Sequence, residues 1–190
     1  MSETNIENLP EKTRSLVVTI LKNRVEIVRM ACQQRAKFEG WLKFELASVL
    51  VSTSGFSNVI LEDSYQSNGR SDISVIYERE KWFIEMKTAN TNWRADGLEN
   101  LTRPITRNMD GIIEDIEILK LKSPPAHGLV VFTIFPIPER LVTQYPAQLN
   151  YHLERIEDDA ILERGILRSV MQYLPVSIYF GIGVFVIQCV

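Results

Sequence analysis

Apolar and polar positions repeat with two different periods along this chain. A period near 3.6 predicts amphipathic helices over residues 11–32, 36–51 and 108–122. A period of two, or a short continuous apolar run, predicts strands at residues 59–62, 72–77, 82–87 and 128–135. Residues 139–173 are expected to be mostly helical. The predicted order is two helices, three strands, a helix, a strand and a mixed extension, which indicates an α/β domain.

The C-terminal segment Leu174–Val190 has no charged residue over 17 positions, which is the lower limit for a membrane-spanning helix. It contains Pro175 and two glycines and is rich in β-branched and aromatic residues. These residue types favour strands over a helix. We therefore predict two buried strands joined by a turn at residues 181–183, and no contact with a membrane.

The segment 72–87 has the pattern of a β-hairpin. A turn centred on residues 79–80 would pair Tyr77 with Trp82 and place Asp72 opposite Lys87. One face is then entirely apolar and consists of Ile73, Val75, Tyr77, Trp82, Ile84 and Met86. The other face carries Asp72, Ser74, Glu85 and Lys87.

Two carboxylates and an ammonium at one end of a hairpin can hold a divalent metal and act on a water molecule. Two histidines and two cysteines in no spaced motif leave oxygen atoms as the plausible metal ligands. Asp72, Glu85 and the backbone carbonyl of Met86 can supply them to Mg²⁺, with Mn²⁺ as a substitute. Lys87 could orient the water, stabilise negative charge, or accept a proton if its pKa is lowered.

A further carboxylate lies within the helix predicted at 36–51. Its apolar stripe consists of Phe38, Trp41, Leu42, Leu46 and Val49, and Glu45 falls in the middle of that stripe. Glu45 can serve the metal site, or it can reach the helix edge and pair with Lys37 or Lys43.

Asp72, twelve further residues, and then Glu85-Met86-Lys87 resemble the motif of the PD-(D/E)XK nuclease superfamily. The resemblance covers roughly residues 36–135. It implies a restriction-endonuclease-like αβββαβ core, in which a mixed sheet is flanked by helices, with an N-terminal helix and a C-terminal helix and strand extension added. It also implies metal-binding acids on the second and third strands and a glutamate from the first core helix, a role that Glu45 fits. Ser71 departs from the proline that often precedes the first acid.

The resemblance implies a Mg²⁺-dependent endonuclease that hydrolyses phosphodiester bonds, with DNA as the expected substrate. The net charge of −3 supplies no global basic field, so phosphate contacts would need a local patch, for which the candidates are Arg70, Arg94, Arg103 and Arg107. Two alternatives stay open. The fold can be a catalytically inactive module that binds nucleic acid or protein, or Asp72 and Lys87 can form a structural ion pair worth less than about 1 kcal/mol.

The length and the 45% of hydrophobic residues suit one globular domain over residues 1–190. Its nuclease-like core would span about 36–135, with additions at 1–35 and 136–190. The polar N-terminal segment lacks the apolar stretch of a signal peptide, so we expect a cytoplasmic protein. A homodimer would suit cleavage of both strands, and the apolar helix at 11–32 or the C-terminal strands could form its interface.

Overall fold

The computed structural model describes residues 9–64, 69–98, 106–122, 127–144 and 168–189. Its helices are α1 (Leu9–Asn23), α2 (Val25–Gln34), α3 (Glu39–Ser52), α4 (Thr106–Lys122) and α5 (Glu139–Thr143). Its strands are β1 (Phe56–Leu61), β2 (Ile73–Tyr77), β3 (Glu80–Asn90), β4 (His127–Pro138), β5 (Arg168–Pro175) and β6 (Phe180–Cys189). The predicted α/β class is confirmed.

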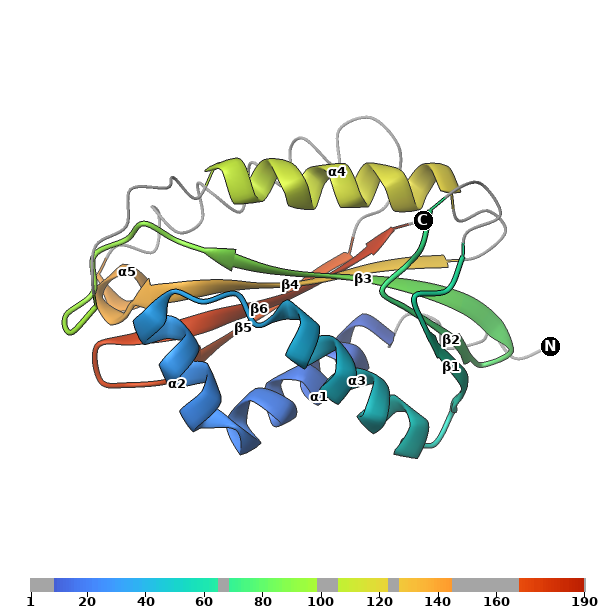
Figure 1. Ribbon diagram of the computed structural model, residues 1–190, viewed down its shortest axis with the longest axis horizontal. Helices are drawn as coiled ribbons and strands as arrows, with labels where there is room; N and C mark the ends of the chain where they lie inside the picture. The colour runs from blue at the N-terminus through green and yellow to red at the C-terminus, as the bar shows by residue number, and fades with distance from the viewer. Residues whose placement is uncertain (1–8, 65–68, 99–105, 123–126, 145–167, 190) are drawn as a thin grey trace.

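The strands form one mixed six-stranded sheet in the order β1-β2-β3-β4-β6-β5. Strands β1, β2 and β3 form an antiparallel meander, whereas β4 pairs parallel to β3. The parallel pair needs a crossover connection, and α4 lies within it. Figure 1 shows three layers, with α4 on one face of the sheet and α1, α2 and α3 on the other.

Each face of the sheet has its own hydrophobic core. The larger core joins α1, α2 and α3 to one face, and the smaller core joins α4 to the other. Strand β4 contributes alternate residues to both, with Val131 in the larger core and Val130 and Phe132 in the smaller one. The prediction that residues 128–135 form a strand covered on both faces is confirmed.

The hairpin has its predicted faces but a different register. Tyr77 pairs with Glu80, and Ile73 pairs with Ile84, so the predicted pairing of Tyr77 with Trp82 is wrong by two residues. Glu78 and Arg79 form the turn, both with positive φ, as in the tight turns that suit a twisted hairpin. A shift of two residues leaves every side chain on its predicted face. The six apolar residues accordingly all lie in the larger core.

The N-terminal helical region contains two helices instead of the one predicted over residues 11–32. The helix breaks at Arg24, where φ is −123° and ψ is 33°. The apolar stripe of α1 packs against β5, β6 and α3. The apolar side of the predicted helix is therefore largely buried inside the domain, with Val18, Leu21, Val28 and Cys32 in the larger core.

The C-terminal region differs from its prediction in two places. Of the segment 139–173 that was expected to be mostly helical, residues 168–173 belong to β5. Residues 145–167 lie outside the described residues. The turn joins β5 to β6 at residues 176–179, and Gly181 and Gly183 lie inside β6. A Cβ atom on Gly181 would lie 2.4 Å from the carbonyl oxygen of Leu174, so close approach of the backbone accounts for this glycine. No helix in the described part of the chain is long and apolar enough to cross a membrane.

Strands β5 and β6 extend the same sheet that contains β1 to β4, because β6 pairs with β4 from Gly128↔Cys189 to Pro138↔Phe180. The segment after residue 135 is thus joined to the predicted core by strand pairing as well as by side-chain packing.

Candidate functional site

The strand β3 extends well beyond its partner β2. Pairing between them ends at Ile73↔Ile84, while β3 stays paired with β4 as far as Asn90↔Phe135. The edge of β3 over residues 85–90 that faces away from β4 therefore has no partner strand among the described residues. We call this edge the notch. Its backbone polar groups need other partners.

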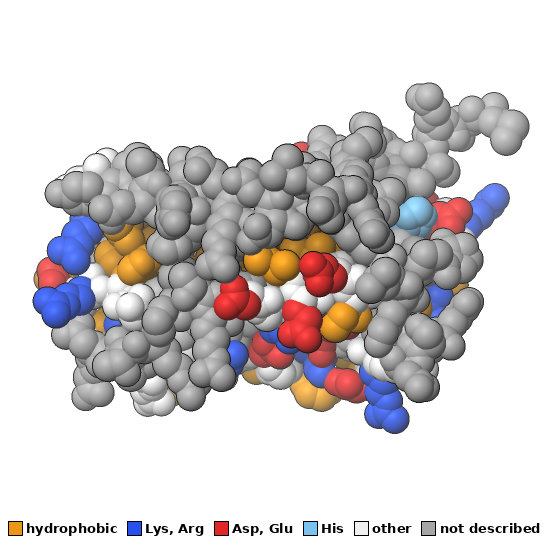
Figure 2. Space-filling view, turned by 90° about the horizontal axis from the view of Figure 1, so that it is seen from above, with side chains coloured by type: hydrophobic (Ala, Val, Ile, Leu, Met, Phe, Trp, Pro, Cys, Tyr) orange, Lys and Arg blue, Asp and Glu red, His pale blue; other side chains and the backbone are white. Residues whose placement is uncertain are grey.

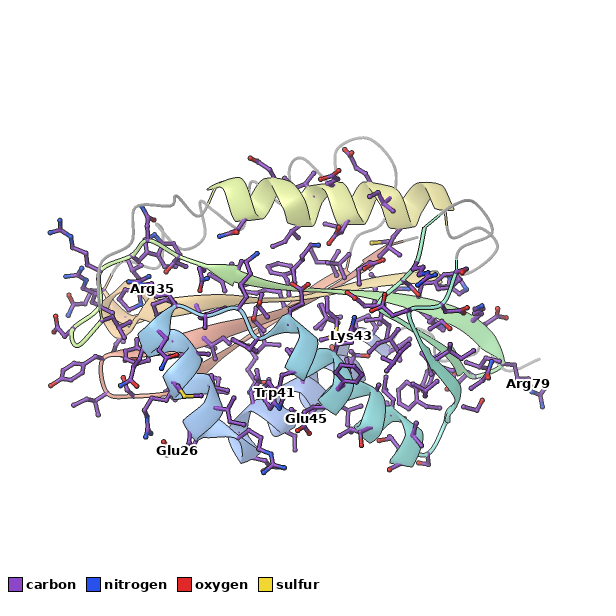
Figure 3. The ribbon with its side chains drawn as sticks, in the orientation of Figure 1. Glu26, Arg35, Trp41, Lys43, Glu45 and Arg79 are labelled. Carbon is purple, nitrogen blue, oxygen red and sulfur yellow. The ribbon has the colours of Figure 1, made fainter. Side chains whose placement is uncertain are left out.

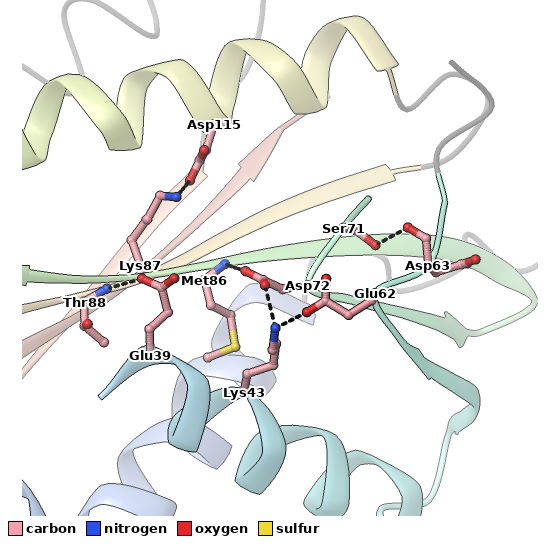
Figure 4. A network of polar contacts seen from close by, with 10 residues as sticks. All are labelled: Glu39, Lys43, Glu62, Asp63, Ser71, Asp72, Met86, Lys87, Thr88 and Asp115. Atoms are coloured by element: carbon pink, nitrogen blue, oxygen red, sulfur yellow. Dashed lines mark hydrogen bonds and ion pairs between the residues drawn. The ribbon is translucent and has the colours of Figure 1, made fainter. Parts of the chain in front are cut away.

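Two carboxylates from distant parts of the chain cap the notch (Figure 4). The Met86 amide donates to Asp72 Oδ2 over 2.9 Å, and the Thr88 amide donates to Glu39 Oε2 over 3.1 Å. The N–H and C=O of one strand residue point to the same edge, so the Met86 carbonyl also faces the notch. The predicted carbonyl ligand thus lies on the same edge as the Asp72 carboxylate.

Lys87 extends from β3 toward α4, where its Nζ lies 3.1 Å from Asp115 Oδ2. Burial lowers the pKa of Lys87, but the carboxylates of Asp115, Glu39 and Glu85 outweigh burial and raise that pKa overall. Lys87 is therefore protonated at neutral pH. Of its three predicted roles, this charge state favours orienting water or stabilising negative charge over accepting a proton.

Asp115 was not predicted as a site residue. Burial raises its pKa, Lys87 opposes that shift, and the nearby carboxylates of Asp72 and Glu39 add to it. Acids from α3, from the residue preceding β2 and from α4 are thus gathered around residues 86–88 of β3. Crowded carboxylates of this kind favour binding of a proton or of a cation.

A second lysine completes the cluster. Lys43 of α3 forms ion pairs with Glu62 and with Asp72, and its Nζ lies 3.1 Å from Asp72 Oδ1. Hydrogen bonding to Glu62 raises the pKa of Lys43, burial opposes this, and Asp72 adds to the increase. Both oxygens of Asp72 are thus engaged, one by an ammonium and one by a backbone amide.

The helical glutamate that reaches the notch is Glu39, six residues before the predicted Glu45. Lys43 lies one turn after Glu39 on the same side of α3, since residues four apart share a helix face. Glu45 is two positions further on, and in Figure 3 it lies on the part of α3 that faces away from the sheet. Within the described residues, no hydrogen bond or ion pair joins Glu45 to Asp72 or Lys87.

The predicted phosphate-contacting arginines do not form one patch in the described structure. Arg70 is exposed in the β1–β2 connection, whereas Arg94 is exposed beyond the C-terminal end of β3, beside Arg140. Arg103 and the side chain of Arg107 lie outside the described residues. Figure 2 shows acidic side chains in the middle of the face that carries α4, with most Lys and Arg side chains toward its ends.

A pocket of about 330 Å³ lies beside the notch, between the N-terminal halves of α3 and α4. This volume is within the range of small-ligand sites. The pocket is lined by Lys37, Glu39, Gly40, Lys87, Asn108 and Gly111. It places two ammonium groups, an amide side chain and a carboxylate around a space open to solvent.

The donor chemistry of this region fits a hard divalent cation. Five carboxylates are offset by two ammonium groups, and the members of this cluster are Glu39, Glu62, Asp72, Glu85, Asp115, Lys43 and Lys87. In the described part of the chain, no three acids, histidines or cysteines are grouped closely enough to hold a metal as they stand. Lys43 Nζ lies 3.1 Å from Asp72 Oδ1, so a cation at this oxygen would meet the Lys43 ammonium.

Comparisons of the chain with protein-family models, with curated proteins and with solved structures found no match.

Proposed function

We propose that the protein is a Mg²⁺-dependent endonuclease that hydrolyses phosphodiester bonds in DNA. The observation that carries this proposal is the gathering of acids and lysines at the notch, next to a pocket that opens to solvent. They come from α3, from the residue preceding β2, and from β3, and they include Glu39, Asp72, Glu85 and Lys87.

The order of elements around the notch supports the proposal. Helix α3, the meander β1–β3, helix α4 and the parallel strand β4 follow one another along the chain. The same order, αβββαβ, is what the resemblance to the PD-(D/E)XK superfamily implies. The resemblance expects metal-binding acids on the second and third strands of this unit. Glu85 lies on the third strand, and Asp72 directly precedes the second.

In this proposal, Asp72, Glu85 and the Met86 carbonyl hold the cation, and Glu39 takes the helical role first assigned to Glu45. The bound cation would supply a polarised phosphoryl oxygen and a more acidic water. Lys87, held in its protonated form by Asp115, stabilises the charge that develops on the phosphate.

The pocket gives the scissile phosphate a place to bind. Lys37 and Asn108 line it together with Glu39 and Lys87, and both can donate hydrogen bonds to phosphate oxygens. The outer side of α4 carries exposed Asp110, Glu114 and Glu117, which repel a nucleic-acid backbone. The substrate would therefore approach at the α3 side of the pocket.

The test is cleavage of plasmid DNA and of single-stranded DNA in the presence of Mg²⁺ or Mn²⁺. We expect Asp72→Asn, Glu85→Gln, Glu39→Gln and Lys87→Met each to lower the cleavage rate by at least about 100-fold, as removal of a transition-state contact does. Glu45→Gln is the matched control, because it makes the same chemical change on the same helix away from the notch, and it should keep wild-type activity. Removal of divalent cations with a chelator should stop cleavage.

Two outcomes would contradict the proposal. One is a wild-type protein that cleaves no nucleic acid on a broad panel of substrates with either cation. The other is equal loss of activity in Glu45→Gln and Glu39→Gln, which would show that the effect comes from α3 as a whole and not from the notch. Far-ultraviolet circular dichroism of each variant checks that it is folded.

A second candidate function is supported by the ion pairs themselves. Lys43 neutralises Asp72 and Lys87 pairs with Asp115, so the acids have partners without a metal. This arrangement also suits a catalytically inactive module of the same fold that binds nucleic acid or protein. Calorimetric titration with Mn²⁺ separates the two, because a catalytic site should bind Mn²⁺ and lose that binding in Glu85→Gln.

A further inference from the structure

The side chain of Lys43 bridges two acids that different segments bring together. Glu62 follows β1 and its amide donates to the Asp72 carbonyl over 3.1 Å, which places the two carboxylates side by side. The Lys43 ammonium forms an ion pair with each of them. Lys43 and Asp72 are mostly buried, with side-chain exposures of 15% and 19%, whereas Glu62 is 51% exposed.

This bridge differs from an ordinary surface ion pair because it occupies Asp72, a carboxylate that is proposed to bind the cation. Asp72 Oδ2 accepts the Met86 amide, and Lys43 Nζ lies 3.1 Å from Oδ1, so a cation that binds Oδ1 meets the Lys43 ammonium there. Lys87 cannot replace Lys43 there, because it points toward α4 and pairs with Asp115. Lys43 is therefore the positive charge that a divalent cation would meet at Asp72.

The exposed Glu62 offers the Lys43 side chain an alternative position. Glu62 lies at the outer end of the bridge, and a Lys43 side chain that left Asp72 could remain paired with Glu62 in a more solvated position. An exchange of this kind would keep the ammonium from being left buried beside a dication, which would be costly.

We propose that Lys43 is a built-in competitor of the divalent cation: it occupies Asp72 in the metal-free protein and is displaced toward Glu62 when the cation binds. The inference rests on the proposed cation site at the notch and adds the residue that sets its affinity. Lys43 thereby stabilises the metal-free protein and weakens cation binding by the same contact.

The alternative role of Lys43 predicts the opposite sign. If Lys43 only held Asp72 in position for the cation, its loss would weaken cation binding together with stability. A competitor that is removed strengthens cation binding while the metal-free protein becomes less stable. The two roles can therefore be separated by binding and stability measurements, without any reading of nuclease activity.

The experiment is calorimetric titration of the full-length chain with Mn²⁺, combined with thermal unfolding with and without Mn²⁺. We expect Lys43→Met to bind Mn²⁺ about tenfold more tightly than wild type, a coupling in the usual range for two linked sites. Its melting temperature should be lower than that of wild type without Mn²⁺, and should rise more when Mn²⁺ is added. Lys43→Gln is also uncharged but can still donate hydrogen bonds, and it should likewise bind Mn²⁺ more tightly than wild type. If Lys43→Met does not fold, the Mn²⁺ affinity of Lys43→Gln tests the inference.

Two control variants keep the interpretation specific. Lys43→Arg retains the charge and should leave Mn²⁺ affinity near that of wild type. Lys81 forms a neighbouring ion pair, in which its Nζ lies 2.8 Å from Asp63 Oδ2. Lys81→Met removes this pair and leaves the Lys43–Asp72 pair in place, so it should not change Mn²⁺ affinity.

Weaker or unchanged Mn²⁺ binding in Lys43→Met and Lys43→Gln would overturn the inference. If wild type still binds Mn²⁺ and Glu85→Gln does not, the proposed cation site survives that result. If Mn²⁺ binds to none of the proteins, both the inference and the proposed metal-dependent function fail.

Discussion

Asp63 is held by two donors from different strands of the meander. Its Oδ2 accepts the Ser74 hydroxyl over 2.6 Å and lies 2.8 Å from Lys81 Nζ. The hydrogen bond from Lys81, followed by that from Ser74, lowers the pKa of Asp63 below its ordinary value of 3.8. Asp63 thus fixes the position of β2 against the β1–β2 connection, next to Glu62 and Asp72.

The sign of this shift sets a pH dependence of stability. Because the folded state lowers the pKa of Asp63, its contribution is fully present above about pH 4 and is lost as the pH falls through the lowered pKa. We expect Asp63→Asn to lower the free energy of unfolding by about 1–2 kcal/mol at pH 7. Urea unfolding of both proteins between pH 2 and 7 should show this difference shrinking at the acid end. A difference that stays constant with pH would contradict the role given to Asp63.

The positions of single carboxylates explain why only part of the site could be predicted. Asp72, Glu85 and Lys87 were identified because a period of two places them on one face of a hairpin, and a register error of two residues does not change faces. Glu45 was chosen because it interrupts an apolar stripe, but Glu39 reaches the notch from the first turn of α3. The missing information was where α3 begins and which of its sides faces β3.

Asp115 could have been found with the reasoning that pointed to Glu45. It falls beside Ile112 and Ile116 on the stripe of α4 that packs against the sheet, and Leu119 continues that stripe. A carboxylate bordering this stripe signals a partner on the sheet. The sequence could not identify that partner as Lys87, because α4 reaches β3 only through the long crossover between β3 and β4.

At the scale of elements, glycines in β6 show how tightly two strands approach. A Cβ atom on Gly181 would lie 2.4 Å from the Leu174 carbonyl oxygen, whereas one on Gly111 in α4 would meet nothing within 4 Å. We expect Gly181→Ala to destabilise the protein by at least about 2 kcal/mol through overpacking. Gly111→Ala should stabilise it by about 0.5–1 kcal/mol, because alanine favours a helix interior.

Urea unfolding of these two glycine variants provides a matched comparison. A neutral Gly181→Ala would show that β5 and β6 can separate at no cost, contrary to the structure. The prediction of a turn at residues 181–183 failed for the same reason that this variant should be costly: glycine is required by turns and by close backbone approach alike, and sequence alone does not separate the two.

At the scale of the molecule, the predicted core of residues 36–135 does not contain all the packing that surrounds it. Val17 and Leu21 of α1 lie in the larger core together with Val184 and Val186 of β6. Strand β6 also pairs with β4 from Gly128 to Ile134 and again at Ile137 and Pro138. The order of the elements up to β4 followed from the hydrophobic pattern, but the docking of the chain ends depended on long-range pairing that a local pattern does not encode.

This packing predicts that a fragment of residues 36–138 does not fold alone. We expect it to lack a cooperative urea transition and near-ultraviolet circular dichroism, because it loses β6 as a partner of β4 and leaves apolar surface on both faces exposed. The full-length chain measured under the same conditions is the control. A cooperative transition of the fragment would instead show that α1, β5 and β6 are additions to an independent domain.

The notch also has a spectroscopic consequence. The backbone amides inside a sheet mostly donate to the neighbouring strand, and their NMR signals depend on that strand. The Met86 and Thr88 amides instead donate to the side chains of Asp72 and Glu39, respectively. Their proton chemical shifts and exchange rates follow the position and charge of those two carboxylates. Two backbone signals on one strand therefore observe Glu39 and Asp72 separately, so that the order in which a ligand engages these acids can be read residue by residue.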